Sequence, residues 1–181
     1  MEKDEKFDVL DKEGNPTGKI KPRKDVHRDG DWHKAVHVWI INSKNELLIQ
    51  KRSPNKDVAP NQWDISVAGH IPAGSDALAT ALRETEEEIG IHIEQKNLEY
   101  LFTVTQSKIK ENYINNEFNE VYLVKLDLDI SKMIFQKEEL TEIKFIHFLE
   151  LEKLINSDND EIFVSHDEEY KKLFELLRMR L

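Results

Sequence analysis

The 181-residue sequence contains no cysteine. Disulfide bonds, thiolate zinc sites and cysteine nucleophiles are therefore excluded. The sequence also lacks a run of the roughly 18 apolar residues that a membrane-spanning helix needs. Its first residues are charged, with no apolar signal segment behind them. From these absences we expect a soluble, cytoplasmic protein.

Positive charge is scarce. The 26 Lys and Arg residues face 36 Asp and Glu residues, which gives a formal net charge of −10. This balance argues against nucleic-acid or anionic-membrane partners. An anionic small-molecule substrate would need a metal ion or a few local cations. Hydrophobic residues make up 39% of the chain, which is enough for a folded core.

Hydrophobic patterning predicts a single α+β domain over residues 1–181. Strands are expected at residues 7–10, 19–21, 35–42, 47–52, 63–67, 98–109, 118–126 and 142–148, and helices at 76–89, 149–156 and 167–180. Residues 1–31 are expected to form a hairpin and a helical turn ahead of a core at 32–181. Residues 110–117 are polar and are expected to connect two strands. Ser75 and Ser165 are expected to cap the helices that follow them.

An acidic helix is the most informative stretch. It follows a glycine-containing turn and ends at Gly90. Glu84, Glu87 and Glu88 are three and four residues apart, and a helical wheel places them opposite the apolar stripe. Like charges at this spacing destabilise a helix, and the macrodipole disfavours anions near its C-terminus. We therefore expect a hard divalent cation with oxygen ligands to compensate them.

The spacing around this helix resembles the Nudix box, G-x(5)-E-x(7)-R-E-U-x-E-E-x-G-U, where U is a bulky apolar residue. The matching residues are Gly69, Arg83, Glu84, Glu87, Glu88, Gly90 and Ile91. Ser75 replaces the first glutamate, and Thr85 replaces an apolar residue. The resemblance implies a Nudix fold, in which a mixed β-sheet lies between α-helices. It also implies a pyrophosphatase-type hydrolase that uses Mg²⁺ or Mn²⁺ to cleave a diphosphate linkage in a nucleotide or another small compound.

The same resemblance implies roles for individual residues. Glu84, Glu87 and Glu88 would bind the metal, together with the backbone carbonyl of Gly69. Either Glu84 or Glu87 could instead act as the general base. Arg83 lies four residues before Glu87 and would orient it.

Further candidates lie outside the box. An additional acidic metal ligand is expected from a later strand, with Glu120 preferred over Glu117 and then over Glu138 or Glu139. Lys51 and Arg52 end a strand and could face the diphosphate, or be exposed. Trp63 could stack on a base, although packing beneath a loop is favoured.

A second resemblance concerns isopentenyl-diphosphate isomerases, which share the Nudix fold. It rests on His33, on the stretch from Trp63 to Ala68-Gly69-His70 and on the Asn119-Glu120-Val121 segment. Ala68 stands where the isomerases have a catalytic cysteine, and Phe118 stands where they have a second glutamate. The chain therefore resembles a hydrolase of the isomerase-related branch. His33 and His70 could be metal ligands, a structural histidine or a polar pocket wall.

Two alternatives stay open beside the hydrolase. One is an isopentenyl-diphosphate delta-isomerase, and the other is a non-catalytic nucleotide-binding module, which the missing carboxylate at Ser75 keeps open. Substrate choice is expected to depend on the loops at residues 53–62, 107–116 and 157–165. The sequence also leaves a homodimer open.

Overall fold

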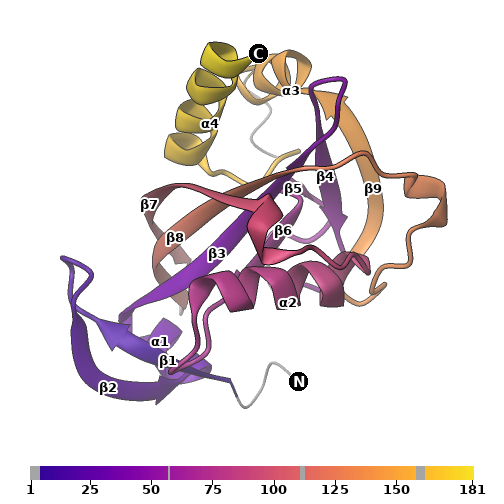
Figure 1. Cartoon of the computed structure of the whole chain (residues 1–181). Helices are drawn as coiled ribbons and strands as arrows, with labels where there is room; N and C mark the ends of the chain where they lie inside the picture. Colours follow the sequence, from indigo (N-terminus) through magenta and orange to yellow (C-terminus); the bar gives the residue numbers. More distant parts are fainter. Residues whose placement is uncertain (1–4, 57, 111–112, 158–161) are drawn as a thin grey trace.

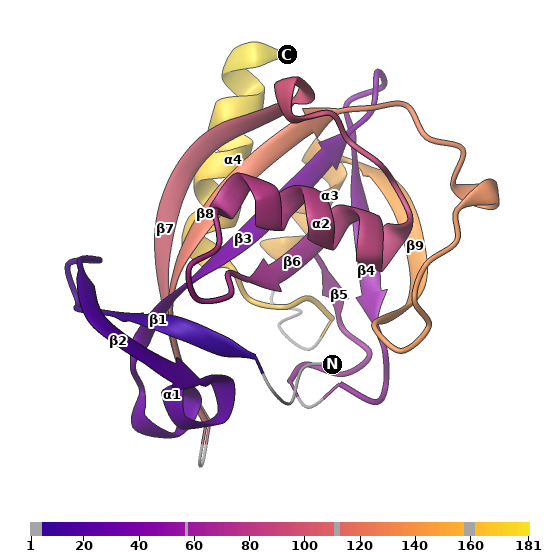
Figure 2. The ribbon, with the colours of Figure 1, turned by 60° about the horizontal axis from the view of Figure 1, so that its bottom comes forward.

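A computed structural model describes residues 5–56, 58–110, 113–157 and 162–181. The strands of this described part are β1 (Lys6–Leu10), β2 (Pro16–Pro22), β3 (Trp32–Ile41), β4 (Glu46–Arg52), β5 (Trp63–Asp64), β6 (Val67–His70), β7 (Leu98–Lys110), β8 (Tyr113–Lys125) and β9 (Leu140–His147). The α-helices are α1 (Arg23–Asp29), α2 (Ala77–Ile89), α3 (Phe148–Ile155) and α4 (Asp167–Arg180). One side of the mixed sheet is covered by α2 and the other by α3 and α4 (Figures 1 and 2). The expected α+β fold, with a mixed sheet between helices, is confirmed.

The central strand β3 positions the rest of the site. It runs antiparallel to β6, where Val36 pairs with Gly69, and parallel to β8, where Val36 pairs with Glu120. Alternate residues of β3 face opposite sides, so that Val36 and Val38 join the core under α2 while Trp39 joins the core under α4. Because both faces are buried, β3 is a nearly continuous apolar run, as the sequence indicates.

Helix α2 begins one residue later than Ser75 would place it. Asp76 is the N-cap, and its Oδ1 accepts a hydrogen bond of 3.0 Å from the backbone N–H of Ala79. Ser75 instead lies in the preceding turn, with its N–H bonded to the carbonyl of Pro72. The capping role expected for Ser75 is therefore wrong. Gly90 ends the helix in the left-handed region, with φ of +70°.

The apolar stripe of α2 differs from expectation at one position. Ala81, Thr85 and Ile89 are buried on this stripe, and the Thr85 hydroxyl donates to the carbonyl of Ala81. Glu88 is also buried, with only 8% of its surface exposed. The idea that all three glutamates lie opposite the packed face is wrong for Glu88, because the C-terminal turn of α2 lies over the end of β4 and Gln50 there bonds the carboxylate.

Strands β7 and β8 form a long antiparallel arm. The polar connector expected at residues 110–117 is mostly wrong, since β8 begins at Tyr113; residues 111–112 lie outside the described part. The polar side chains of the arm bond to neighbouring chain instead of to solvent alone. Asn116 donates to the carbonyl of Gly30 at 2.7 Å and accepts from the Ser107 hydroxyl at 2.7 Å. The polar composition of residues 113–117 therefore does not indicate a loop, because these residues belong to β8.

Other boundaries shift slightly. The single strand expected at residues 63–67 is split, because the Ser66 hydroxyl donates to the carbonyl of Leu48 and accepts from the N–H of Ile40. Ser165 does not cap α4, whose N-cap residue is His166. Of the loop expected at residues 157–165, residues 158–161 lie outside the described part. No helix among the described residues is both long and apolar enough to cross a bilayer.

Strands β1 and β2 form the expected N-terminal hairpin. Leu10 of β1 pairs with Trp32 of β3, and the N–H of Ala73 donates to the carbonyl of Lys6. The hairpin therefore contacts both β3 and the turn before α2. The division of the chain at residue 32 stays a proposal.

Candidate active site

The Glu84 side chain lies directly over Gly69. A Cβ atom at position 69 would stand 2.4 Å from Cδ of Glu84, so only glycine allows this approach. Burial raises the pKa of Glu84 to about 7, although the Arg83 guanidinium acts in the opposite direction. The structure therefore brings together the two ends of the box, residue 69 and residue 84.

Glu88 is the most buried of the three glutamates. Its Oε2 accepts a hydrogen bond of 3.1 Å from Nε2 of Gln50 on β4. Burial, and then the nearby charge of Glu84, raise the pKa of Glu88 to about 8. Sequence reasoning missed Gln50; the available signal was one amide in the otherwise apolar start of its strand, Leu-Leu-Ile-Gln.

Arg83 bridges the other two glutamates. Its guanidinium donates to Oε2 of Glu87 at 2.8 Å and to Oε1 of Glu84 at 2.7 Å. The contact with Glu87 is the one expected from the spacing of four residues. The Glu87 side chain is 51% exposed, so it faces solvent at the opening of the site.

The donor set fits a hard divalent cation. Glu84 and Glu87 share the guanidinium of Arg83, whereas Glu88 has only the amide of Gln50 as a hydrogen-bond partner. Burial raises the pKa of both Glu84 and Glu88. Carboxylate and backbone carbonyl oxygens are the ligands that Mg²⁺ and Mn²⁺ prefer. Glu86 is 63% exposed and points away from this group.

Glu120 lies near this site but is engaged elsewhere. It shares the row of Val36 and Gly69, two strand spacings from Gly69, which is about 10 Å. Its carboxylate accepts from Nζ of Lys34 at 2.9 Å and from the hydroxyl of Tyr122 at 3.1 Å. A role of Glu120 as metal ligand stays a proposal.

The other acidic candidates for metal binding lie in three different environments. Glu117 lies on the opposite face of the sheet from Glu84. Glu139 forms an ion pair with Lys56, and its charge contributes to the raised pKa of Glu88. Glu138 is exposed.

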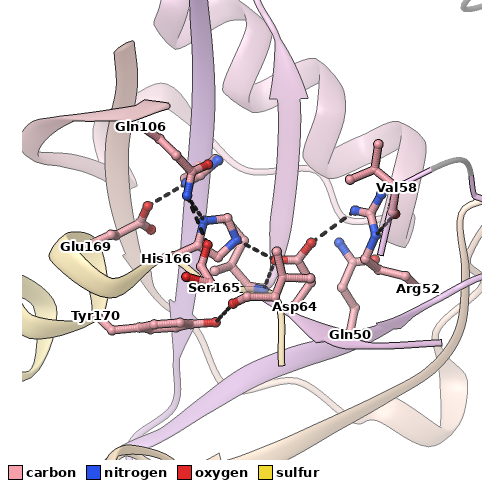
Figure 3. Close-up of polar contacts among 12 residues, drawn as sticks. Gln50, Arg52, Val58, Asp64, Gln106, Ser165, His166, Glu169 and Tyr170 are labelled. Atoms are coloured by element: carbon pink, nitrogen blue, oxygen red, sulfur yellow. Dashed lines mark hydrogen bonds and ion pairs between the residues drawn. The ribbon is translucent and has the colours of Figure 1, made fainter. Parts of the chain in front are cut away.

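The cationic and aromatic candidates are held by β5 and its neighbours. Arg52 donates to Oδ2 of Asp64 at 3.0 Å and to the carbonyl of Val58 at 3.1 Å (Figure 3). The ring of Trp63 has Nζ of Lys51 6.0 Å from its centroid and Nζ of Lys144 at 4.1 Å. Trp63 also packs against the core under α4, which agrees with the packing role favoured from the sequence.

A histidine cluster lies where β3, β6 and α1 meet. The ligand atoms of His27, His33 and His70 are all within 4.8 Å of one another. Oε1 of Glu117 is 3.1 Å from Nε2 of His70 and 3.6 Å from Nε2 of His33. Burial lowers the pKa of His27 to about 3 and also lowers that of His70. Neutral imidazoles beside a carboxylate could hold a transition metal. His27 was missed, since nothing in its local pattern distinguishes it.

A second buried polar group lies under the start of α4. Glu169 accepts from Nε1 of Trp39 at 2.8 Å and pairs with Nδ1 of His37 at 2.6 Å. His166 Nε2 lies 2.9 Å from Oδ1 of Asp64, which in turn meets Arg52 (Figure 3). The pKa of Asp64 is well below its usual range because His166 and Arg52 outweigh its burial. Sequence reasoning did not identify this group.

Comparison with known proteins agrees with the box. The family model of the NUDIX domain matches residues 31–166 of this chain. The chain belongs to the Nudix family.

Relatives of this family member include Nudix hydrolase 3 of Arabidopsis thaliana, which is 44% identical over 98% of the chain. The match covers 24% of that protein, so the chain spans about a quarter of its length. Isopentenyl-diphosphate Delta-isomerase 2 of Photorhabdus laumondii is 29% identical over 87% of the chain and 85% of its own length. A crystal structure of DR0079 from Deinococcus radiodurans superposes with a TM-score of 0.70 at 22% identity, covering 97% and 98% of the two chains. The fold, the Nudix hydrolase family and the isomerase-related branch expected from the sequence are therefore confirmed.

Proposed function

We propose that this Nudix hydrolase cleaves the phosphoanhydride bond of a small diphosphate compound with the help of Mg²⁺ or Mn²⁺. The observation that carries the proposal is the acidic group at Gly69, where Glu84 and Glu88 are partly or fully buried with raised pKa values. A diphosphate would be repelled by these carboxylates alone. A divalent ion between them reverses the sign of the local charge.

The residues of the site then take the following roles. A divalent ion bound here supplies positive charge against the diphosphate and lowers the pKa of a bound water. Glu84, Glu87 and Glu88 would hold the ion, with the carbonyl of Gly69 as a further ligand. Arg83 orients Glu84 and Glu87 through its two hydrogen bonds. Either Glu84 or Glu87 could instead act as the general base that accepts the proton of the attacking water.

Several residues would support substrate binding. Arg52 contributes positive charge while tied to Asp64, and Lys51 lies beside Trp63 at the end of β4. His70 forms part of a polar wall on the far face of β6. The substrate would be a nucleotide or another small diphosphate, encountered in the cytoplasm. The homodimer left open by the sequence stays a prediction, which sedimentation velocity measures.

A panel of diphosphate compounds tests the proposal. Each compound is incubated with Mg²⁺, with Mn²⁺ and with EDTA, and phosphate, pyrophosphate and nucleoside monophosphate are measured. We expect metal-dependent turnover that Glu87→Gln and Glu88→Gln abolish, while Glu86→Gln, on the exposed side of the same helix, retains it. Unchanged turnover in both site variants would exclude this mechanism. Metal-dependent binding without any product would indicate the non-catalytic nucleotide-binding alternative.

A second candidate, isomerisation of isopentenyl diphosphate, is favoured by one observation. The cluster of His27, His33, His70 and Glu117 provides a ligand set for a transition metal beside Ala68, on the same face of β6. Ala68 itself argues against isomerisation, since it has no group that could exchange a proton. Conversion of isopentenyl to dimethylallyl diphosphate by the metal-loaded protein would support this candidate, and hydrolysis without conversion would exclude it.

A further inference from the structure

The start of β1 lies against the turn that precedes α2 (Figure 1). The carbonyl of Lys6 accepts a hydrogen bond of 2.8 Å from the N–H of Ala73, and Oδ2 of Asp8 accepts one of 2.7 Å from the N–H of Gly74. The same turn contains Ser75, at the position where the Nudix box has its first glutamate. Glu5, the residue before β1, is therefore held beside the turn in which this chain lacks a carboxylate.

Two contacts with α1 fix Glu5 itself. Its carbonyl accepts a hydrogen bond of 2.8 Å from the N–H of Arg23, and its Oε2 accepts one of 3.3 Å from Nη1 of the same residue. The Glu5 side chain is only 20% exposed. Its Oε1 has no hydrogen-bond partner among the residues that the structure describes. One carboxylate oxygen is thus held in place, and the other is available to a ligand.

Glu5 is close enough to the acidic helix to act on it. Burial raises the pKa of Glu84, and the charges of Glu87 and Glu5 raise it further. Glu84 lies over Gly69, which leads into the turn that the start of β1 contacts. The backbone contacts and the charge therefore agree in placing Glu5 beside the part of the acidic site that contains Glu84.

A cavity of about 680 Å³ opens beside Glu5, between the β1–β2 hairpin and the turn before α2. Its lining consists of Glu5, Lys6, Ile20, Pro22, Pro72 and Ala73. A bound Mg²⁺ usually keeps several of its waters, because it dehydrates reluctantly. The cavity provides room for such waters next to the Glu5 carboxylate.

An ion pair that only fastens α1 to β1 is the simpler role for Glu5 and Arg23. Such a pair would serve equally well at a distance from the acidic helix. Here it brings another negative charge toward Glu84 and Glu87, which repel it. A divalent ion among these carboxylates turns the repulsion into attraction, so the placement of Glu5 favours a role in metal binding.

We propose that Glu5 is a further ligand of the divalent ion at the acidic helix, and that it supplies the carboxylate that Ser75 does not. The proposal rests on the metal site proposed above. Arg23 keeps the Glu5 carboxylate oriented. The N-terminal hairpin is then part of the site, because it carries one of the ligands.

Calorimetry with Mn²⁺ alone tests the role of Glu5, since it requires no substrate. We expect Glu5→Gln, which is nearly isosteric, to raise the dissociation constant of Mn²⁺ about tenfold or more relative to wild type. Glu13→Gln, the same change at an exposed position of the same hairpin, should leave it within about twofold. The loss in Glu5→Gln should persist in about 1 M KCl, where the influence of a distant charge is screened. An unchanged dissociation constant in Glu5→Gln, equal changes in the two variants, or a loss that disappears at high salt would overturn the proposal.

Failure of the proposed metal site is distinguishable. If Glu88→Gln loses affinity for Mn²⁺ and Glu5→Gln keeps it, the site stands and the role of Glu5 is refuted. If wild type binds no Mn²⁺, both proposals fail. If wild type binds Mn²⁺ but hydrolyses no diphosphate, the hydrolysis fails and the dissociation constants still decide the role of Glu5.

Urea unfolding in EDTA separates a fastening role from a ligand role. A Glu5 that only fastens α1 would make metal-free Glu5→Gln less stable without changing its affinity for Mn²⁺, and that result would overturn the proposal. Glu5→Ala gives the same readout of affinity if the glutamine variant does not fold.

Discussion

The pKa values of buried carboxylates are shifted in opposite directions on the two faces of the sheet. Under α4, Glu169 and Asp64 each have a basic partner, and the pKa of each is lowered. Under α2, Glu84 and Glu88 are also buried, but their pKa values are raised to about 7 and about 8. Basic partners thus compensate the buried carboxylates on the α4 face, whereas the α2 face has more buried negative charge than its basic groups compensate.

This difference distinguishes carboxylates that stabilise the fold from carboxylates that are available to bind a cation. A buried ion pair with its hydrogen bonds complete holds α4 against β3 and needs nothing further. Carboxylates buried without enough positive charge destabilise the protein by itself, and a cation would relieve that cost. The comparison therefore indicates a structural role for the buried pair around Glu169 on the α4 face, and it supports the proposed catalytic role of the α2 face.

The largest effect is expected from two adjacent residues of β6 that face opposite sides. Gly69→Ala would displace Glu84, because the new Cβ would lie 2.4 Å from its Cδ. The Glu84 side chain can move, so stability should change little, while kcat/KM should fall at least about a hundredfold, roughly 2.7 kcal/mol. Ala68→Gly, which removes one methyl group on the other face, is the control. Retained activity in Gly69→Ala would show that the position of Glu84 is not critical.

The same substitution on the two faces should have opposite effects on stability. Glu169→Gln weakens the bonds to His37 and Trp39 and should lower the free energy of unfolding by about 2–3 kcal/mol. Glu88→Gln removes an uncompensated carboxylate and should leave the metal-free protein equally or more stable. Urea unfolding at pH 7 in EDTA measures both. Similar losses in the two variants would remove the distinction between the faces.

The features of the two faces that depend on residues close together in the sequence could be predicted. The spacing of Arg83, Glu84, Glu87 and Glu88 defines one helix surface, so that a linear motif was sufficient to find it. The apolar patterns of β3 and β4 likewise predict strands, because burial on each face leaves a trace in the order of residues. The start of α2 was misplaced by one residue because Ser75 and Asp76 are both good caps.

Contacts between residues far apart in the sequence could not be predicted. Glu169 and His37 are 132 residues apart in sequence, and Asp64 and His166 are 102 apart. No periodicity encodes which buried polar groups meet across a sheet, since that depends on strand register and on the docking of α4. Gln50 beside Glu88 was missed for the same reason.

Metal ions should distinguish the two faces next. Mg²⁺ or Mn²⁺ at about 100 times its dissociation constant should stabilise wild type by roughly 2.7 kcal/mol, because it binds only the folded site. Thermal unfolding with and without the ion measures this. Glu87→Gln, which changes a half-exposed residue of the proposed metal site, should lose most of the stabilisation, whereas Glu169→Gln should keep it. An equal response of the two variants would place the metal outside the acidic helix.

The smallest effect concerns the pH dependence of the pair on the α4 face. The facing groups are Glu169 of α4, His166 at its N-cap, Glu117 of β8 and Asp64 of β5. The charge of Glu169 raises the pKa of His37 above 6.5 despite burial. The His37 charge in turn lowers the pKa of Glu169 below 4.5. The contribution of His37 is complete below pH 6.5 and is lost as pH rises through its raised pKa. That of Glu169 is complete above pH 4.5 and is lost as pH falls through its lowered pKa.

The ionised pair should therefore stabilise the fold most between pH 4.5 and 6.5. Urea unfolding of wild type and Glu169→Gln at several pH values isolates this contribution as the difference between the two free energies of unfolding. We expect that difference to shrink as pH rises above 6.5, because His37 then loses its proton and the interaction becomes a neutral hydrogen bond. A difference that stays constant up to pH 10 would mean that His37 is neutral throughout, and the α4 face would then leave Glu169 as uncompensated as the glutamates of α2.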